Sequence, residues 1–275
     1  MTMSPDTSTT STRPGRSRRA LIVGLVLAAI ALAAAVVWYT GREAPAAVDT
    51  QAAIDAANVE AAADDTEASD AQPDADADTD SSPTSGDEEV PAAWQVVTDA
   101  VEYDLIAGTG TFIGFRIAEE LTTVGDTEAV GRTPQVEGTV TLDGTTLVAA
   151  TIVGDLTALT TDIRQRDGAT QRALNTGVHP TTTFTLTEAV DLGTTPVVGE
   201  AISVEAVGEL TLNGVTQPVT VALDAVLLDG VAGLLVTGSF PLTLADHDLT
   251  APSAPIVVSV ADTATIELQL YLDPA

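Results

Sequence analysis

Residues 201–225 read AISVEAVGELTLNGVTQPVTVALDA, and this stretch decides the fold class. Apolar or small residues alternate with mostly polar ones on both sides of Asn213-Gly214. A period of two is typical of a strand with one buried face, and Asn-Gly between two such runs is the strongest short-range signal for a hairpin. The stretch therefore predicts two antiparallel strands joined by a two-residue turn.

The same patterning extends over residues 93–275, which we take as one domain. Alternation recurs at 136–142, and we expect further strands at 111–117, 147–159, 182–188, 231–244 and 256–272, the last broken near Asp262. Only residues 166–175 look helical. About seven to nine strands with hairpin turns and no strand–helix–strand alternation indicate an antiparallel barrel or a sandwich. We favour the barrel, because closure removes the edges of the sheet.

The first 39 residues predict a membrane anchor. Residues 20–39 form an uncharged run of 20 residues, which spans roughly 30 Å as a helix. Four arginines precede this run, so residues 1–19 are expected to be a basic cytoplasmic tail. The protein is then a single-pass protein of the cytoplasmic membrane with its domain outside. The alternative is a cleaved signal peptide, whose apolar region is usually shorter.

Residues 40–92 are expected to be a disordered acidic tether. From position 43 onward this segment holds fifteen carboxylates and no basic or aromatic residue, so it cannot bury enough apolar surface to fold alone. A flexible chain of about fifty residues spans roughly 40 Å. Calcium binding is the alternative, but the segment lacks the glycine and terminal glutamate of an EF-hand loop.

Composition excludes several functions. With 40 acidic residues against 10 basic ones and a net charge of -30, the surface cannot track nucleic acid. This acidity fits either a high-salt habitat or a codon bias. The absence of cysteine excludes disulfides and thiolate chemistry. No GxSxG motif is present, and adjacent strand residues such as Asp246, His247 and Asp248 point to opposite faces. We therefore expect no enzyme, cofactor or metal site.

Four short motifs carry a resemblance to a known family. They are Trp94 at the start of the domain, Arg166-Asp167, HPTTTF at 179–184, and GELTLNGVTQPV at 208–219. Together they resemble the YceI-like family over Trp94 to Leu272. The resemblance implies an all-β fold, a lipocalin-like antiparallel β-barrel of about eight strands with one short helix. It also implies that a long polyisoprenoid chain lies in an apolar tunnel of that barrel.

The residues agree with such a ligand. Aromatic residues are scarce, so inward positions are nearly all Val, Leu, Ile and Ala, which suit a flexible aliphatic chain better than a planar ring. The alternative is a small barrel filled by its own side chains. The function implied by the resemblance is extracytoplasmic binding, sequestration or transport of an isoprenoid lipid of prenyl quinone or prenyl phosphate type. A non-binding structural or interaction module of the cell envelope is the second hypothesis. The oligomeric state is left open, with a homodimer as one option.

Eight residues are candidates for contact with the ligand. The two arginines are included because a guanidinium binds a phosphate head group well, although an ion pair with a carboxylate is the competing role. His179 is expected to pack in a loop. The eight candidates are Phe112, Phe115, Arg116, Arg166, Phe184, Leu186, Leu210 and Leu212.

Overall fold

The computed structural model describes residues 44–68, 90, 92–229 and 232–275. The predicted cytoplasmic tail (1–19) and membrane anchor (20–39) lie outside these residues, as do residues 40–43, 69–89 and 91 of the predicted tether. No helix in the described part of the chain is both long and apolar enough to span a bilayer.

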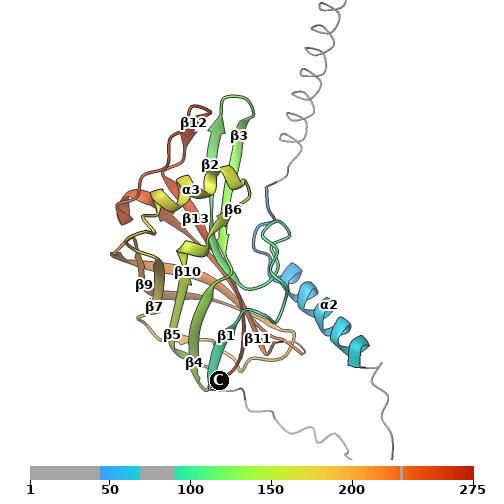
Figure 1. The fold of residues 1–275 in the computed structure, drawn as a ribbon. Helices are drawn as coiled ribbons and strands as arrows, with labels where there is room; N and C mark the ends of the chain where they lie inside the picture. Colours follow the sequence, from blue (N-terminus) through green and yellow to red (C-terminus); the bar gives the residue numbers. More distant parts are fainter. Residues whose placement is uncertain (1–43, 69–89, 91, 230–231) are drawn as a thin grey trace, which may run out of the picture. The chain divides into compact units, whose positions relative to one another are not determined.

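Eight strands of the described chain close into an antiparallel ring, which confirms the predicted barrel (Figure 1). The ring closes because β13 pairs with β1 as well as with β11. In order around the ring the strands are β1 (Ala93–Val97), β4 (Val136–Asp143), β5 (Thr146–Asp155), β7 (Thr181–Leu186), β9 (Ala201–Leu212), β10 (Val215–Leu227), β11 (Leu234–Thr243) and β13 (Thr263–Pro274).

Further strands extend this ring beside β13. The first half of β13 pairs with β2 (Phe112–Leu121), which continues into β3 (Gly125–Thr133) and the two-residue β6 (Thr160–Thr161). β12 (Val257–Val260) pairs with the far end of β2, and β8 (Val190–Asp191) pairs with β5. The predicted break near Asp262 separates β12 from β13, whereas β3 was not predicted.

The structure of the turn explains why the motif has Asn at position 213 and Gly at position 214. Both residues have positive φ, 52° and 75°, as a type I′ hairpin requires. A Cβ at Gly214 would lie 2.5 Å from the ring of His179, so a side chain has no room there. The Asn213 amide donates to the carbonyl of His247, and its Oδ1 accepts from Asn175. His179 therefore packs in a loop, as predicted.

Short helices cover one end of the barrel. The predicted helix is α3 (Arg164–Ala173), and two 3₁₀ turns, η1 (Leu156–Ala158) and η2 (Leu244–His247), lie at the same end. The Gln171 side chain donates to the carbonyls of Leu156 and Leu159, at 2.9 Å each. Asp167 accepts from both the amide and the hydroxyl of Thr161. These bonds fix α3 across the end of the barrel.

The prediction of disorder is wrong for residues 44–68, which we call the docking segment. Asp49 caps α2 (Thr50–Ala68), which lies outside the barrel (Figure 1). Ala53 and Ala57 are buried against Tyr271, whose hydroxyl donates to the Ala53 carbonyl at 2.7 Å. Alanine favours helix, and its small side chain allows close approach. The outer wall of the barrel supplies the apolar partner that the segment lacks in its own sequence.

Candidate functional site

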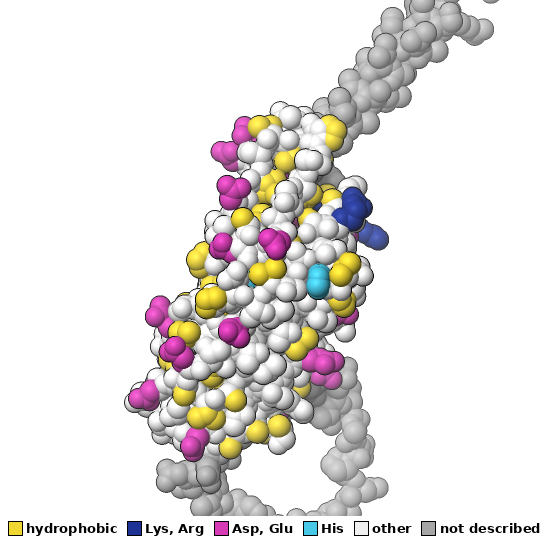
Figure 2. Space-filling view, turned by 90° about the vertical axis from the view of Figure 1, so that its left-hand side faces the viewer, with side chains coloured by type: hydrophobic (Ala, Val, Ile, Leu, Met, Phe, Trp, Pro, Cys, Tyr) yellow, Lys and Arg dark blue, Asp and Glu magenta, His cyan; other side chains and the backbone are white. Residues whose placement is uncertain are grey.

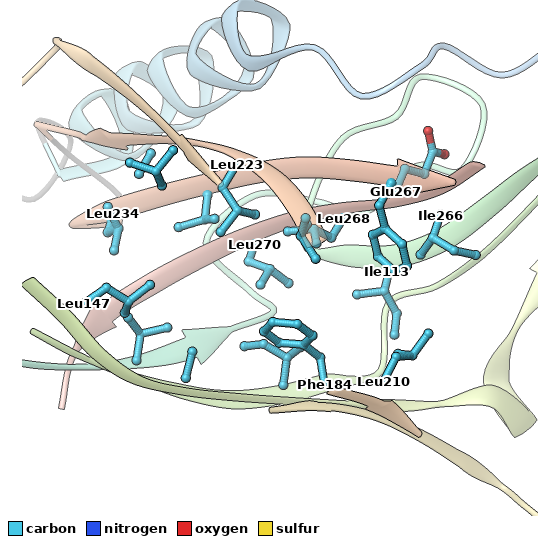
Figure 3. Close-up of a pocket in the computed structure, with 18 of the residues that line it drawn as sticks. Ile113, Leu147, Phe184, Leu210, Leu223, Leu234, Ile266, Glu267, Leu268 and Leu270 are labelled. Atoms are coloured by element: carbon cyan, nitrogen blue, oxygen red, sulfur yellow. The ribbon is translucent and has the colours of Figure 1, made fainter. Parts of the chain in front are cut away.

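The barrel encloses an apolar cavity of about 190 Å³ (Figure 3). Its wall comes from the inward-facing residues of all eight strands of the ring, because alternate residues of a strand face the lumen. The labelled side chains in Figure 3 point toward one another across this space, with Glu267 as the exception. Residues of the three longest contributing strands are Ile202, Val204, Leu210 and Leu212 of β9, Val221, Leu223, Ala225 and Leu227 of β10, and Ile266, Leu268 and Leu270 of β13.

The lumen is more open at one end than at the other. Along β9, the inward side chains of Ile202 and Val204 are half-buried, whereas Leu210 and Leu212 are 7% and 6% exposed. On β10, Leu227 is half-buried and Val221 is buried. The solvent-accessible mouth therefore lies where β9 begins and β10 ends, and α3 with its neighbours closes the other end.

Three charged side chains form a buried cluster on the outside of the wall. Glu267 Oε1 accepts from Arg132 Nε at 2.8 Å and from Nη2 at 2.6 Å, and Oε2 accepts from Arg116 Nε at 2.9 Å. The guanidinium groups also donate to the carbonyls of Pro45 and Ala46 in the docking segment. Glu267 is thus the one titratable residue on the described lining, and its carboxylate is turned away from the lumen.

Four of the eight candidate residues line the cavity. These are Phe115, Phe184, Leu210 and Leu212. They come from β2, β7 and β9, and the alternation of those strands turns them all inward.

The other four candidates lie elsewhere. Phe112 is fully buried on the outer face, with the guanidinium of Arg132 4.3 Å from the centre of its ring. Arg116 belongs to the outer cluster, and Arg166 pairs with Glu119 at 2.9 Å. Leu186 is half-buried on β7 and is not part of the cavity wall. The competing role for the two arginines, ion pairing, is what the structure shows.

Sequence reasoning missed most of the wall. Apart from Glu267, the lining residues of β10 and β13 follow a period of two, from Val221 to Leu227 and from Ile266 to Leu270. This parity was the available signal for the inward face. Trp94, which opens the domain, also lines the cavity.

The fold and cavity define a class, a closed antiparallel barrel with an apolar lumen capped at one end by a short helix. Within that class, the chain belongs to the YceI-like family, since the model of the YceI-like domain matches residues 103–272. No curated protein matches the sequence.

Three solved structures give the likeness in numbers. A polyisoprenoid binding domain from Saccharophagus degradans, implicated in plant cell wall breakdown, is 19% identical with a TM-score of 0.51, covering 67% of this chain and 99% of that one. BcnA of Burkholderia cenocepacia is 16% identical with a TM-score of 0.44, covering 58% and 94%. A Campylobacter jejuni YCEI protein is 14% identical with a TM-score of 0.41, covering 53% and 85%. The first supports the fold, and no argument below depends on the other two.

Proposed function

We propose that the barrel binds the hydrocarbon chain of a polyisoprenoid lipid and sequesters or carries it, without catalysis. The observation that supports this proposal best is the chemistry of the lumen, whose wall is built almost entirely from hydrocarbon side chains with the charged group of Glu267 turned outward. The name of the Saccharophagus degradans domain, a polyisoprenoid binding domain, is consistent with it.

The size of the lumen sets a condition on the ligand. At about 0.8 kcal/mol per buried CH₂, ten carbons contribute about 8 kcal/mol, which association costs of about 4–15 kcal/mol largely cancel. About twenty buried carbons are needed for tight binding. The cavity of about 190 Å³ is below the range of roughly 300–1,000 Å³ of ligand pockets. Lining side chains must therefore move outward when the chain enters.

The test is retention of geranylgeraniol by the full chain, purified in detergent and measured by native mass spectrometry. We expect the protein to retain this twenty-carbon alcohol and the variant Ala225→Phe, which adds a ring inside the lumen, to lose it. Ala222→Phe is the matched control, because Ala222 is exposed on the opposite face of the same strand. Equal retention by both variants, or none by the native protein, would favour the structural-module hypothesis instead.

We also propose that the domain lies outside the cytoplasmic membrane, held by residues 20–39. The uncharged run and the four preceding arginines support this location. Cell fractionation with a carbonate wash tests the anchor, and protease added to intact spheroplasts tests the side. Release of the protein by carbonate would refute the hypothesis that residues 20–39 are a retained anchor. An intact mass that corresponds to a chain starting after residue 39 would refute it as well.

A further inference from the structure

The described lining of the lumen offers a charged head group no ionisable side chain that is free to pair with it. Of the lining residues with polar side chains, Thr182 already donates its hydroxyl to the Thr211 carbonyl at 3.0 Å. Glu267 is occupied by two arginines on the other side of the wall, as its orientation in Figure 3 indicates. Burying a charge without a partner is strongly unfavourable. A charged head group would therefore have to stay at the mouth.

The mouth is bordered by carboxylates. Four exposed acidic residues each lie within two positions of a residue that lines the cavity at this end, namely Leu142, Leu192, Ile202 or Leu227. The four are Asp143, Asp191, Glu200 and Asp229.

Basic side chains of the described chain lie away from this mouth. Arg116 and Arg132 are ion-paired on the outside of the wall, and Arg166, on α3, is ion-paired with Glu119. Arg164 and Arg172 are exposed on α3, which covers the closed end. On the face drawn in Figure 2, acidic side chains are spread along the molecule, whereas arginines are confined to one place. Among the five arginines that the structure describes, none lies at the mouth to bind a phosphate.

We infer that the ligand carries an uncharged head group, such as an alcohol or a quinone, and that prenyl phosphates are excluded. The inference rests on the proposed function and narrows it. A phosphate monoester carries about -1.5 to -2 charges at neutral pH. Its position beside four carboxylates is unfavourable within a Debye length of about 8–10 Å. An alcohol or a quinone meets no such repulsion.

The experiment offers the full chain in detergent equal amounts of geranylgeraniol and geranylgeranyl monophosphate. Native mass spectrometry then measures both bound species, and the Ala225→Phe variant subtracts ligand held outside the lumen. We expect at least a tenfold preference for the alcohol, about 1.4 kcal/mol, and a smaller preference at high salt. Equal or better retention of the phosphate overturns the inference and leaves the proposed function standing. Retention of neither compound refutes both.

A double variant tests whether the rim sets the choice. Asp191→Arg with Glu200→Arg places two guanidinium groups at the mouth and changes no residue of the lumen wall. We expect phosphate retention to rise at least tenfold while alcohol retention stays within twofold. An unchanged ratio of the two ligands would show that the rim charges do not select the head group.

Discussion

Replacing Glu267 by Gln should be the most destabilising single change of charge in the described chain. The carboxylate is 2% exposed and accepts three hydrogen bonds from Arg116 and Arg132, and Arg132 itself is fully buried. The amide of Gln is neutral, so two buried guanidinium groups lose their counter-charge. Removing one partner of a buried ion pair costs about 3–5 kcal/mol. Two arginines share this one carboxylate, so we expect the upper half of that range.

The assay compares urea and thermal unfolding of Glu267→Gln with that of Glu128→Gln. Glu128 also binds Arg116, but its side chain is 38% exposed, so its loss should cost below about 1 kcal/mol. At about 2–4 °C per kcal/mol for a domain of this size, a loss of about 4–5 kcal/mol in Glu267→Gln should lower Tm by roughly 8–20 °C. Similar small losses in the two variants would refute the reasoning.

A second measurement distinguishes a local effect of the charged cluster on the docking segment from a loss of stability of the whole domain. Arg116 and Arg132 also donate to the carbonyls of Pro45 and Ala46, so disturbing them should loosen the docking segment first. Limited proteolysis should therefore cut residues 44–68 faster in Glu267→Gln at temperatures where the barrel is still folded. Cleavage spread evenly over the domain would contradict this order of events.

Two further predictions concern the buried wall. Burial raises the pKa of Tyr103 to about 12 and also raises that of Tyr271, so the folded state keeps protons that the unfolded chain loses near pH 10. Stability should thus be fully present below pH 10 and fall between pH 10 and 12. In Tyr271→Phe the urea midpoint should fall less steeply with pH over this range than in the native protein. The variant should also be about 1 kcal/mol less stable at neutral pH, because the hydrogen bond of the Tyr271 hydroxyl is lost. The same dependence of the midpoint on pH in both proteins would show that Tyr271 does not contribute to this loss of stability. Gly114→Ala puts a Cβ 2.3 Å from the backbone carbonyl oxygen of Gly131 and should cost about 1–3 kcal/mol, whereas Gly177→Ala meets nothing within 4 Å and is the control.

The barrel was predictable because its signals are local. Alternation and the Asn213-Gly214 turn depend on residues that are neighbours in the sequence, and both appear in the structure as expected. The inward face of β9 follows from the same alternation, and Leu210 and Leu212 on that face line the cavity.

Of the three candidate residues on β2, only one lines the cavity, and the sequence could not distinguish them because both faces of that strand are buried. Phe115 faces the lumen, whereas Phe112 and Arg116 face the docking segment and its neighbouring loop. A strand with one solvent face shows its inward side by polarity, and β2 has no such contrast. The cover on its outer face comes from residues far away in the sequence, which were themselves expected to be disordered.

The docking segment was missed for a related reason. Its sequence carries alanines and carboxylates, with no large apolar stripe to indicate a partner. What orders it is long-range: the Tyr271 hydroxyl, and two guanidinium groups that need carbonyl acceptors. Composition alone describes what a segment can bury by itself, and not what another part of the chain offers to it.

Because of the docking segment, the compact folded unit is longer than the stretch that matches the family model. The family match begins at residue 103, but β1 (Ala93–Val97) completes the ring and residues 44–68 cover the charged cluster. A recombinant fragment cut at the family boundary would lose β1 and leave edges on β4 and β13, which invite aggregation. A fragment begun at Ala93 would keep the ring but strip the acceptors from two buried arginines. Expression and engineering of this barrel should start at Ala44, where the compact unit begins.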